Sequence, residues 1–261
     1  MEIWHIVFNG EIYDYKELRA ELETFGISFC THSDTEVLVN TIQQYGEKAL
    51  DKLRGMFGFA VWNEKEQTLM LARDFFGIKP VYYAEIDGHF VFASEIKSIL
   101  AFPGYERKVN QKALEQYLSF QYAPLEETFF KGIYKLMPGH MLLYKNGNYE
   151  IKTYFKTKLT PGKWNRTTNM DQLRSQLAEI LKDSVKHHML SDVEVGAFLS
   201  GGVDSGYLAS ASGADQAFTV GFDEGDRYSE VNKAAKVAEK AGLKHHVKSY
   251  PSRNSGMPFQ M

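Results

Sequence analysis

The first 155 residues alternate short apolar runs with charged or glycine-containing turns. Two stretches carry apolar residues at helical spacing, and each is followed directly by a glycine, which commonly ends a helix. The other apolar runs are short and separated by turn residues, as is typical of strands. The pattern predicts a layered α+β domain with helices at 15–25 and 34–45 and strands at 3–8, 57–62, 68–73, 81–86 and 89–93.

A polar stretch without periodicity follows at 156–170, and we interpret it as a linker between two domains, 1–155 and 171–261. A helix is predicted to open at 168–171, which has the spacing of a capping box with Asp in place of Glu, and to run to about His188. Beyond it, strands and helices alternate, which implies a parallel sheet with crossover helices. The expected strands are 193–199, 216–220 and 245–250, and the expected helices are 205–211 and 229–241.

The composition is that of an ordinary globular protein, with 44% hydrophobic and 24% charged residues in 261. A formal net charge of −3 gives no basic excess that would favour nucleic acid or an anionic membrane. No apolar run approaches the length of a membrane span, and Glu2 stands where a signal peptide needs bases. One cysteine, Cys30, excludes an internal disulfide and paired-thiol zinc sites. We therefore expect a cytoplasmic protein that binds neither nucleic acid nor membrane.

The strongest chemical signal is the segment LSGGVDS at 199–205, between a predicted strand and a predicted helix. Two glycines let the backbone approach an oxyanion closely, and the helix start adds N–H groups and the positive end of its dipole. Asp204 alone would repel a phosphate, which suggests a magnesium ion between carboxylate and phosphates. The segment lacks the lysine of the P-loop and does not fit the dinucleotide fingerprint. The alternative is a plain Gly-Gly turn before a helix.

This segment resembles the S-G-G-x-D-S loop of the ATP pyrophosphatases, which cleave ATP to AMP and pyrophosphate while adenylating a substrate. The preceding residues, 192–198, resemble the corresponding strand of glutamine-dependent asparagine synthetases. Residues 217–222 resemble their next strand, where a valine lies against the adenine. The resemblance implies that Mg²⁺ is bound at Asp204, and that ATP is bound by Leu199, Ser200, Gly201, Gly202, Asp204, Ser205 and Val220.

A second resemblance lies in the first domain, where FNGEIYDY at 8–15 is similar to the N-G-E-I-Y-N-Y segment of class II glutamine amidotransferases. A side-chain amide beside a glycine N–H suits the oxyanion that forms on an attacked amide carbonyl. The resemblance implies that Asn9 and Gly10 form this oxyanion hole and also contact the bound glutamine. It further implies that Asp34, in a segment similar to S-D-T-E, holds the α-amino group of glutamine, and that Glu11 helps to hold its amino-acid end.

Taken alone, Asn9-Gly10 is also compatible with a type I′ turn and Ser33-Asp34 with a helix N-cap. Their occurrence in family order, followed by a third similar region, favours the glutaminase interpretation. This third region resembles the core strands of the same domain and covers 55–62, 71–83 and 92–97. We interpret its charged residues Arg73, Asp74 and Lys79 as structural.

Class II glutaminases use the cysteine at their mature N-terminus, whose thiol attacks the amide and whose α-amino group acts as the base. This chain begins Met1-Glu2, and Cys30 is expected to pack as a small apolar residue. The chain also stops before the synthetase segment S-G-E-G-x-D-E. We therefore expect a layered α+β glutaminase of the Ntn-hydrolase type that lacks its N-terminus. It is followed by the start of an α/β parallel-sheet domain of the PP-loop ATP pyrophosphatase type, and the chain as given is expected to be an inactive fragment.

The resemblance implies ATP-dependent amidation of aspartate to asparagine, with ammonia from glutamine and a β-aspartyl-AMP intermediate. Glutamine, aspartate and ATP are then the small-molecule partners, ATP and Mg²⁺ the cofactors, and a homodimer of the full-length form is left open. Two alternatives remain. One is a related adenylating amidotransferase of the β-lactam synthetase type or one acting on sugars or peptides. The other is a non-catalytic remnant that binds nucleotide or a full-length partner.

Overall fold

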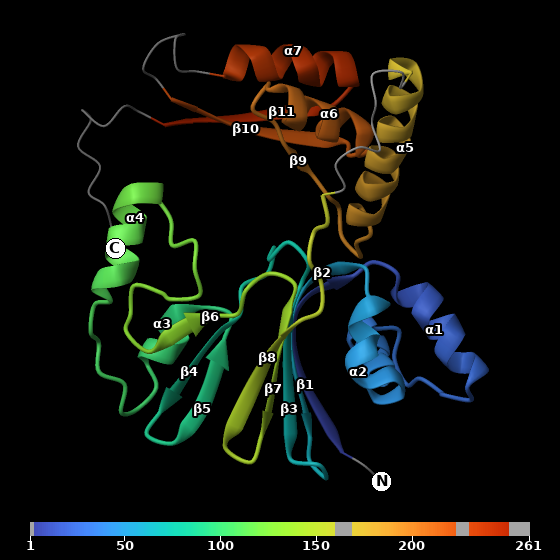
Figure 1. Cartoon of the computed structure of the whole chain (residues 1–261). Coiled ribbons are helices and arrows are strands. Elements are labelled where there is room, and N and C mark those ends of the chain that lie inside the picture. Colours follow the sequence, from blue (N-terminus) through green and yellow to red (C-terminus); the bar gives the residue numbers. More distant parts are fainter. Residues whose placement is uncertain (1–2, 160–168, 223–229, 251–261) are drawn as a thin grey trace. The chain divides into compact units, whose positions relative to one another are not determined.

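A computed structural model describes residues 3–159, 169–222 and 230–250 of the chain (Figure 1). The chain divides into two compact units, Met1–Thr160 and Pro161–Met261, and each unit is treated by itself. Thr168 of the expected capping box, Ser229 at the start of an expected helix and most of the expected linker lie outside the described residues. Among the described helices, none has an apolar stretch long enough to cross a bilayer.

The first unit is built on two antiparallel sheets. The larger has the order β1-β2-β3-β7-β8, with β1 (Trp4–Ile12), β2 (Gly55–Asn63), β3 (Thr68–Arg73), β7 (His140–Lys145) and β8 (Asn148–Thr153). The smaller has the order β5-β4-β6, with β4 (Tyr82–Ile86), β5 (His89–Ala93) and β6 (Ile133–Lys135). The helices are α1 (Tyr15–Thr24), α2 (Asp34–Tyr45), the 3₁₀ helix η1 (Gly46–Asp51), α3 (Ile96–Leu100) and α4 (Gln111–Phe120).

Alternation along the strands determines how these elements are layered, because neighbouring residues of a strand point to opposite faces. Phe59 of β2 belongs to the core that the larger sheet shares with α1 and α2, whereas Ala60 packs with Tyr83 of β4. On the other face of the smaller sheet, Ala84 packs with Ile99 of α3. The order of layers is therefore helix, sheet, sheet, helix (Figure 1), which confirms the layered α+β architecture expected from the sequence.

Helix α2 begins and ends at the predicted residues because both caps are present. The side chain of Ser33 accepts a hydrogen bond from the Thr35 N–H at 3.1 Å, and Gly46 closes the helix with φ of 58°. Strand β1, in contrast, is longer than expected and continues through Asn9 and Gly10. The type I′ turn considered for these two residues is therefore wrong, because both pair with β2.

The second unit contains a three-stranded parallel sheet in the order β11-β10-β9, as the alternation of elements predicted. The predicted strand at 193–199 is wrong in length, because β9 pairs with β10 at only two positions at the edge of the sheet. The elements are α5 (Met170–His188), β9 (Ala197–Phe198), α6 (Val203–Ala211), β10 (Gln216–Phe222), α7 (Val231–Ala241) and β11 (Lys244–Tyr250).

One face of this parallel sheet packs against α6 and α7 through small side chains. Ala217 of β10 is buried with Ala209 of α6 and Ala234 of α7, and such small residues let helices approach a sheet closely. Phe218 and Val220 point to the opposite face and are 39% and 51% exposed. The face of β10 that carries Val220 is thus accessible within the unit.

Candidate functional site

The pairing of β1 with β2 fixes the positions of Asn9 and Gly10. Asn9 lies opposite Gly58 and Gly10 lies opposite Phe57 in the antiparallel register. A β-carbon on Gly10 would lie 2.1 Å from the carbonyl oxygen of Met56 and 2.8 Å from Cα of Phe57. Only glycine therefore fits at this position, and the two backbones hold the Gly10 main chain in a defined place.

The side chain of Asn9 lines a small cavity between β1, β2 and the end of β5. Its amide Nδ2 donates a hydrogen bond to Oγ of Ser94 at 3.3 Å. The cavity measures about 90 Å³ and is lined by Val7, Asn9, Gly58, Phe59, Ala60, Val81, Phe92, Ala93 and Ser94. An amide carries two N–H donors, so the bond to Ser94 orients the group and leaves a second donor for a ligand. Ser94 was not singled out in the sequence.

The carboxylate of Asp74 is bound to the main chain of β2 at the residue that lies opposite Gly10. Asp74 is 1% exposed, and it accepts the N–H groups of Phe57 at 3.2 Å, Phe76 at 3.1 Å, Ile78 at 2.9 Å and Lys79 at 2.9 Å. Four donors satisfy a buried charge that would otherwise be costly. Because Phe57 is the partner of Gly10, Asp74 ties the turn after β3 to the strand pair that forms the site.

Arg73 also has a structural role, because its side chain binds main-chain groups. Its guanidinium donates to the carbonyl oxygens of Gly77, Lys79 and Leu136, each at 2.8 Å. Burial lowers the pKa of Arg73 from its ordinary value, while the negative charge of Asp74 raises it. These contacts agree with the structural interpretation of Arg73 and Asp74, and Lys79 contributes through its backbone.

The residues that follow Gly10 carry negative charge. Tyr13 is 7% exposed, and burial raises the pKa of its hydroxyl; the nearby carboxylates of Glu11 and Asp74 raise it further. Glu11 itself is half-buried at the end of β1. Glu11 thus brings an acidic side chain to the end of the strand that carries Asn9 and Gly10.

Asp34 comes to the same end of β1 from a distant part of the chain. It is the first residue of α2, and its Oδ2 accepts the N–H of Ile12 at 3.1 Å. Its Oδ1 accepts the hydroxyl of Thr35 at 3.3 Å. The structure thus brings together Asp34 and the strand that carries Asn9, Gly10 and Glu11, although 22 residues separate Ile12 from Asp34.

In the second unit, the residues of the predicted phosphate-binding loop lie between β9 and α6. Oγ of Ser200 lies 2.9 Å from Oγ of Ser205, and Ser205 Oγ also accepts the N–H of Ser200 at 3.3 Å. Gly201 has φ of 79°, and a β-carbon there would lie 2.7 Å from the backbone N of Ala234. The loop is therefore packed closely on α7, with both serine hydroxyls turned toward each other at the start of α6.

A buried threonine holds the residue that precedes this loop. The hydroxyl of Thr219 donates to the carbonyl oxygen of Leu199 at 2.6 Å, and its oxygen lies 2.7 Å from Nε2 of His245. Leu199 also donates its N–H to the carbonyl oxygen of Phe218 at 2.9 Å. All three strands of the sheet therefore help to position Leu199. The sequence pattern did not single out Thr219, because its partners lie on other strands.

Asp204 and Val220 are both accessible. Asp204 is exposed in the first turn of α6, and Val220 is 51% exposed on β10. In the part of the chain that the structure describes, no group of three or more metal-ligating side chains occurs. A magnesium ion at Asp204 would fit this arrangement if phosphate oxygens and water completed its oxygen ligands, which is its usual mode of binding with nucleotides.

Comparison with known proteins gives a family match for each unit. Residues 1–155 match the family model for a glutamine amidotransferase domain, and residues 176–254 match the model for asparagine synthase. Over 249 residues the chain is 42% identical to asparagine synthetase (glutamine-hydrolyzing) 1 of Bacillus subtilis, covering 94% of this chain and 38% of that protein. It is 39% identical over 227 residues to asparagine synthetase (glutamine-hydrolyzing) 2 of the same organism, covering 82% of this chain and 30% of that protein.

Among solved structures, the chain is similar to the glutamine phosphoribosylpyrophosphate amidotransferase from B. subtilis complexed with ADP and GMP. The identity is 19%, the TM-score is 0.43, and the match covers 98% of this chain and 49% of that one. The chain spans less than half of the length of these relatives.

Proposed function

Because the chain belongs to the glutamine amidotransferase domain family, we propose that its first unit binds glutamine at the end of β1. The observation that carries this proposal is the bond from the Ile12 N–H to Oδ2 of Asp34. It places a carboxylate, the natural partner of an α-amino group, beside the strand that carries Asn9 and Gly10. In this arrangement Asp34 and Glu11 hold the amino-acid end of glutamine.

At the other end of the ligand, Asn9 and Gly10 supply the oxyanion hole. Ser94 uses one N–H of the Asn9 amide, and the second N–H and the Gly10 N–H donate to the carboxamide oxygen of glutamine. These donors favour the oxyanion that develops when the carbonyl is attacked, because they are held in place before the reaction. Pairing with β2 holds the main chain of Gly10 in place, with no room for a β-carbon against Met56 and Phe57.

The nucleophile for hydrolysis is not assigned to a residue of this site. Cys30 is the single cysteine of the chain, and the expectation that it packs as a small apolar residue is wrong, because it lies exposed in the loop before Asp34. Its backbone N–H is bound to Glu36. We give Cys30 no catalytic role and therefore test the first unit by the binding of glutamine rather than by its turnover.

Replacement of Asp34 by asparagine is expected to weaken glutamine binding by the 261-residue chain about 10- to 100-fold. The amide keeps the size of the side chain but removes the charge from the bond to the ammonium group, which contributes roughly 1.5–3 kcal/mol. Isothermal titration calorimetry with glutamine measures the change, and Asp51→Asn, an exposed aspartate of η1, is the matched control. Equal affinities for the wild-type chain and Asp34→Asn would refute the role of Asp34.

We infer that the second unit binds ATP through residues 199–205, with Mg²⁺ at Asp204 and the adenine against Val220. The hydroxyls of Ser200 and Ser205 and the N–H groups at the start of α6 donate to phosphate oxygens, a combination suited to anions. For the whole protein we propose ATP-dependent conversion of aspartate to asparagine through β-aspartyl-AMP, with ammonia from glutamine. The 42% identity to an asparagine synthetase supports this reaction.

Replacement of Asp204 by asparagine is expected to weaken ATP binding about tenfold in the presence of Mg²⁺. Without Mg²⁺ the same variant is expected to bind ATP at least as well as the wild-type chain, because a carboxylate beside phosphates is repulsive when no cation lies between them. Calorimetry with ATP in Mg²⁺ and in EDTA separates the two cases. Asp215→Asn, an exposed aspartate of the same unit, is the control. An equal effect of Asp204→Asn in both buffers would exclude a metal-bridging role.

A further inference from the structure

The carboxylate of Glu36 is turned back from helix α2 onto the loop that precedes it. Oε1 accepts the N–H of Cys30 at 2.7 Å, and Oε2 accepts the N–H of Thr31 at 2.6 Å. The hydroxyl of Thr31 donates to the same Oε2. Three donors from two consecutive residues therefore converge on one side chain, and bonds to a charged acceptor are the stronger kind.

This arrangement differs from an ordinary capping box. There, the glutamate at the third helical position bonds to the N–H of the N-cap residue. Here Ser33 is the N-cap and Glu36 is the third residue, but Glu36 bonds to residues two and three positions before the cap. The N–H of Ser33 instead donates to Oγ1 of Thr31 at 3.2 Å. Thr31 thus links Glu36 to Ser33, the residue directly before Asp34.

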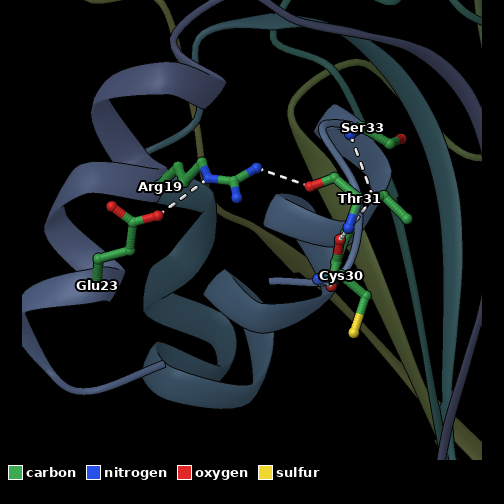
Figure 2. A network of polar contacts seen from close by, with 6 residues as sticks. Arg19, Glu23, Cys30, Thr31 and Ser33 are labelled. Atoms are coloured by element: carbon green, nitrogen blue, oxygen red, sulfur yellow. Dashed lines mark hydrogen bonds and ion pairs between the residues drawn. The ribbon is translucent and has the colours of Figure 1, made fainter. Parts of the chain in front are cut away.

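A second helix holds the same loop from the other side. Figure 2 shows Arg19 of α1 between Glu23 and Thr31. Nη1 of Arg19 donates to the carbonyl oxygen of Thr31 at 2.7 Å, and its Nε bonds to Glu23 at 3.1 Å. The guanidinium also lies 4.6 Å from the centre of the Phe29 ring. The N–H of Thr31 is therefore bound to α2 through Glu36, and its carbonyl oxygen is bound to α1 through Arg19.

The loop depends on these polar bonds because Thr31, His32 and Ser33 are exposed and contribute little packing. The hydrogen bonds from Thr31 and Cys30, aided by the positive charge of Arg19, lower the pKa of Glu36. Glu36 is therefore ionised at neutral pH, the state in which both of its oxygens accept.

We propose that Glu36 is a positioning residue for the α-amino group of glutamine. By fixing Thr31 and, through it, Ser33, it keeps Asp34 in the orientation in which Oδ2 bonds to Ile12 and Oδ1 retains a lone pair for the ligand. Arg19 assists by holding the Thr31 carbonyl. This inference rests on the proposed binding of glutamine through Asp34.

The test compares glutamine with 4-carbamoylbutanoate, which is glutamine without the α-amino group. Glu36→Gln keeps the size of the side chain but removes its charge and one acceptor for the loop. In the 261-residue chain, this variant is expected to bind glutamine about tenfold more weakly, because the charge-assisted bond between Asp34 and the α-amino group is misplaced. It is expected to bind 4-carbamoylbutanoate within about twofold of the wild type, because this ligand has no α-amino group. Calorimetry gives both dissociation constants. Glu47→Gln, which removes an exposed ion pair with Lys152 in the same unit, is the matched control and should change neither.

A second variant keeps the inference testable if Glu36→Gln unfolds. Thr31→Val removes the hydroxyl that links Glu36 to Ser33 but keeps both N–H bonds to the carboxylate, and it is expected to show the same selective loss. If either folded variant binds both ligands more weakly by the same factor, or retains the preference for glutamine, Glu36 has no positioning role. If the wild-type chain does not prefer glutamine and Asp34→Asn has no effect, the proposed glutamine site itself is wrong.

Discussion

Replacement of Asp74 by asparagine is expected to lower the free energy of unfolding of the first unit by about 4 kcal/mol. Each carboxylate oxygen of Asp74 accepts two backbone N–H groups in a site that is 1% exposed. An asparagine amide can replace one oxygen only, and its NH₂ would then face two N–H donors, those of Phe57 and Lys79 or those of Phe76 and Ile78. Leaving a donor unpaired beside this buried side chain costs roughly 1–3 kcal/mol, so two such donors account for the expected loss.

Urea unfolding of the full chain measures this effect. Trp4 and Trp62 lie in β1 and β2, and a Trp164→Phe background restricts the fluorescence signal to them. Asp51→Asn is the control, since an exposed substitution should change the stability by less than about 0.5 kcal/mol. If Asp74→Asn lowered the free energy of unfolding by less than about 1 kcal/mol, the four bonds to Asp74 would not be needed for the stability of the first unit.

The same substitution connects stability with the proposed site. The N–H of Phe57 donates a hydrogen bond to the Asp74 carboxylate, and Phe57 lies opposite Gly10, so a loosened β2 also displaces the Gly10 N–H. We therefore expect glutamine binding to fall in Asp74→Asn under conditions in which the chain is still folded. If this loss is measured, Asp74 supports the proposed binding of glutamine without contacting the ligand.

The elements that could be predicted from the sequence are those with local signals. The first two helices have periodic apolar faces and glycines at their ends, and α2 agrees at both boundaries. The smaller sheet shows the opposite case. Its hairpin β4–β5 is joined by Asp87-Gly88, a local turn signal, whereas β6 joins it from 40 residues further along the chain and was not predicted. Strands β7 and β8 and helices α3 and α4 were likewise not predicted from the pattern.

The proposed site residues show the same division. Asn9 and Gly10 have the local chemistry of a turn, and only their pairing with β2 shows that they lie within a strand. Ser94 contacts Asn9 across 85 residues and Thr219 contacts Leu199 across 20, so neither has a local signal. Glu36, like Ser94 and Thr219, lies in a segment that resembles the family, but the resemblance gave it no role. Its bonds to the main chain of the preceding loop, however, depend on a conformation that residue types alone do not specify.

Replacement of Gly10 by alanine is expected to cost about 3 kcal/mol or more and to abolish detectable binding of glutamine. The new β-carbon would lie 2.1 Å from the Met56 carbonyl oxygen, which belongs to the backbone of β2 and cannot rotate away. The strands must therefore separate locally, and overpacking of this kind commonly costs 1–3 kcal/mol before lost hydrogen bonds are counted. Separation would also move the Asn9 amide and the Ile12 N–H, which is bound to Asp34.

Gly26→Ala provides the matched control for this substitution. Gly26 has φ of 82°, but a β-carbon there would meet nothing within 4 Å, so alanine incurs only the backbone cost of a left-handed residue, about 1 kcal/mol. Thermal unfolding and calorimetry with glutamine on both variants distinguish the two causes. If Gly10→Ala were no less stable than Gly26→Ala and bound glutamine normally, the close approach of β1 and β2 would not determine the site. If only Gly10→Ala lost glutamine binding, the loss would be caused by the changed spacing of β1 and β2.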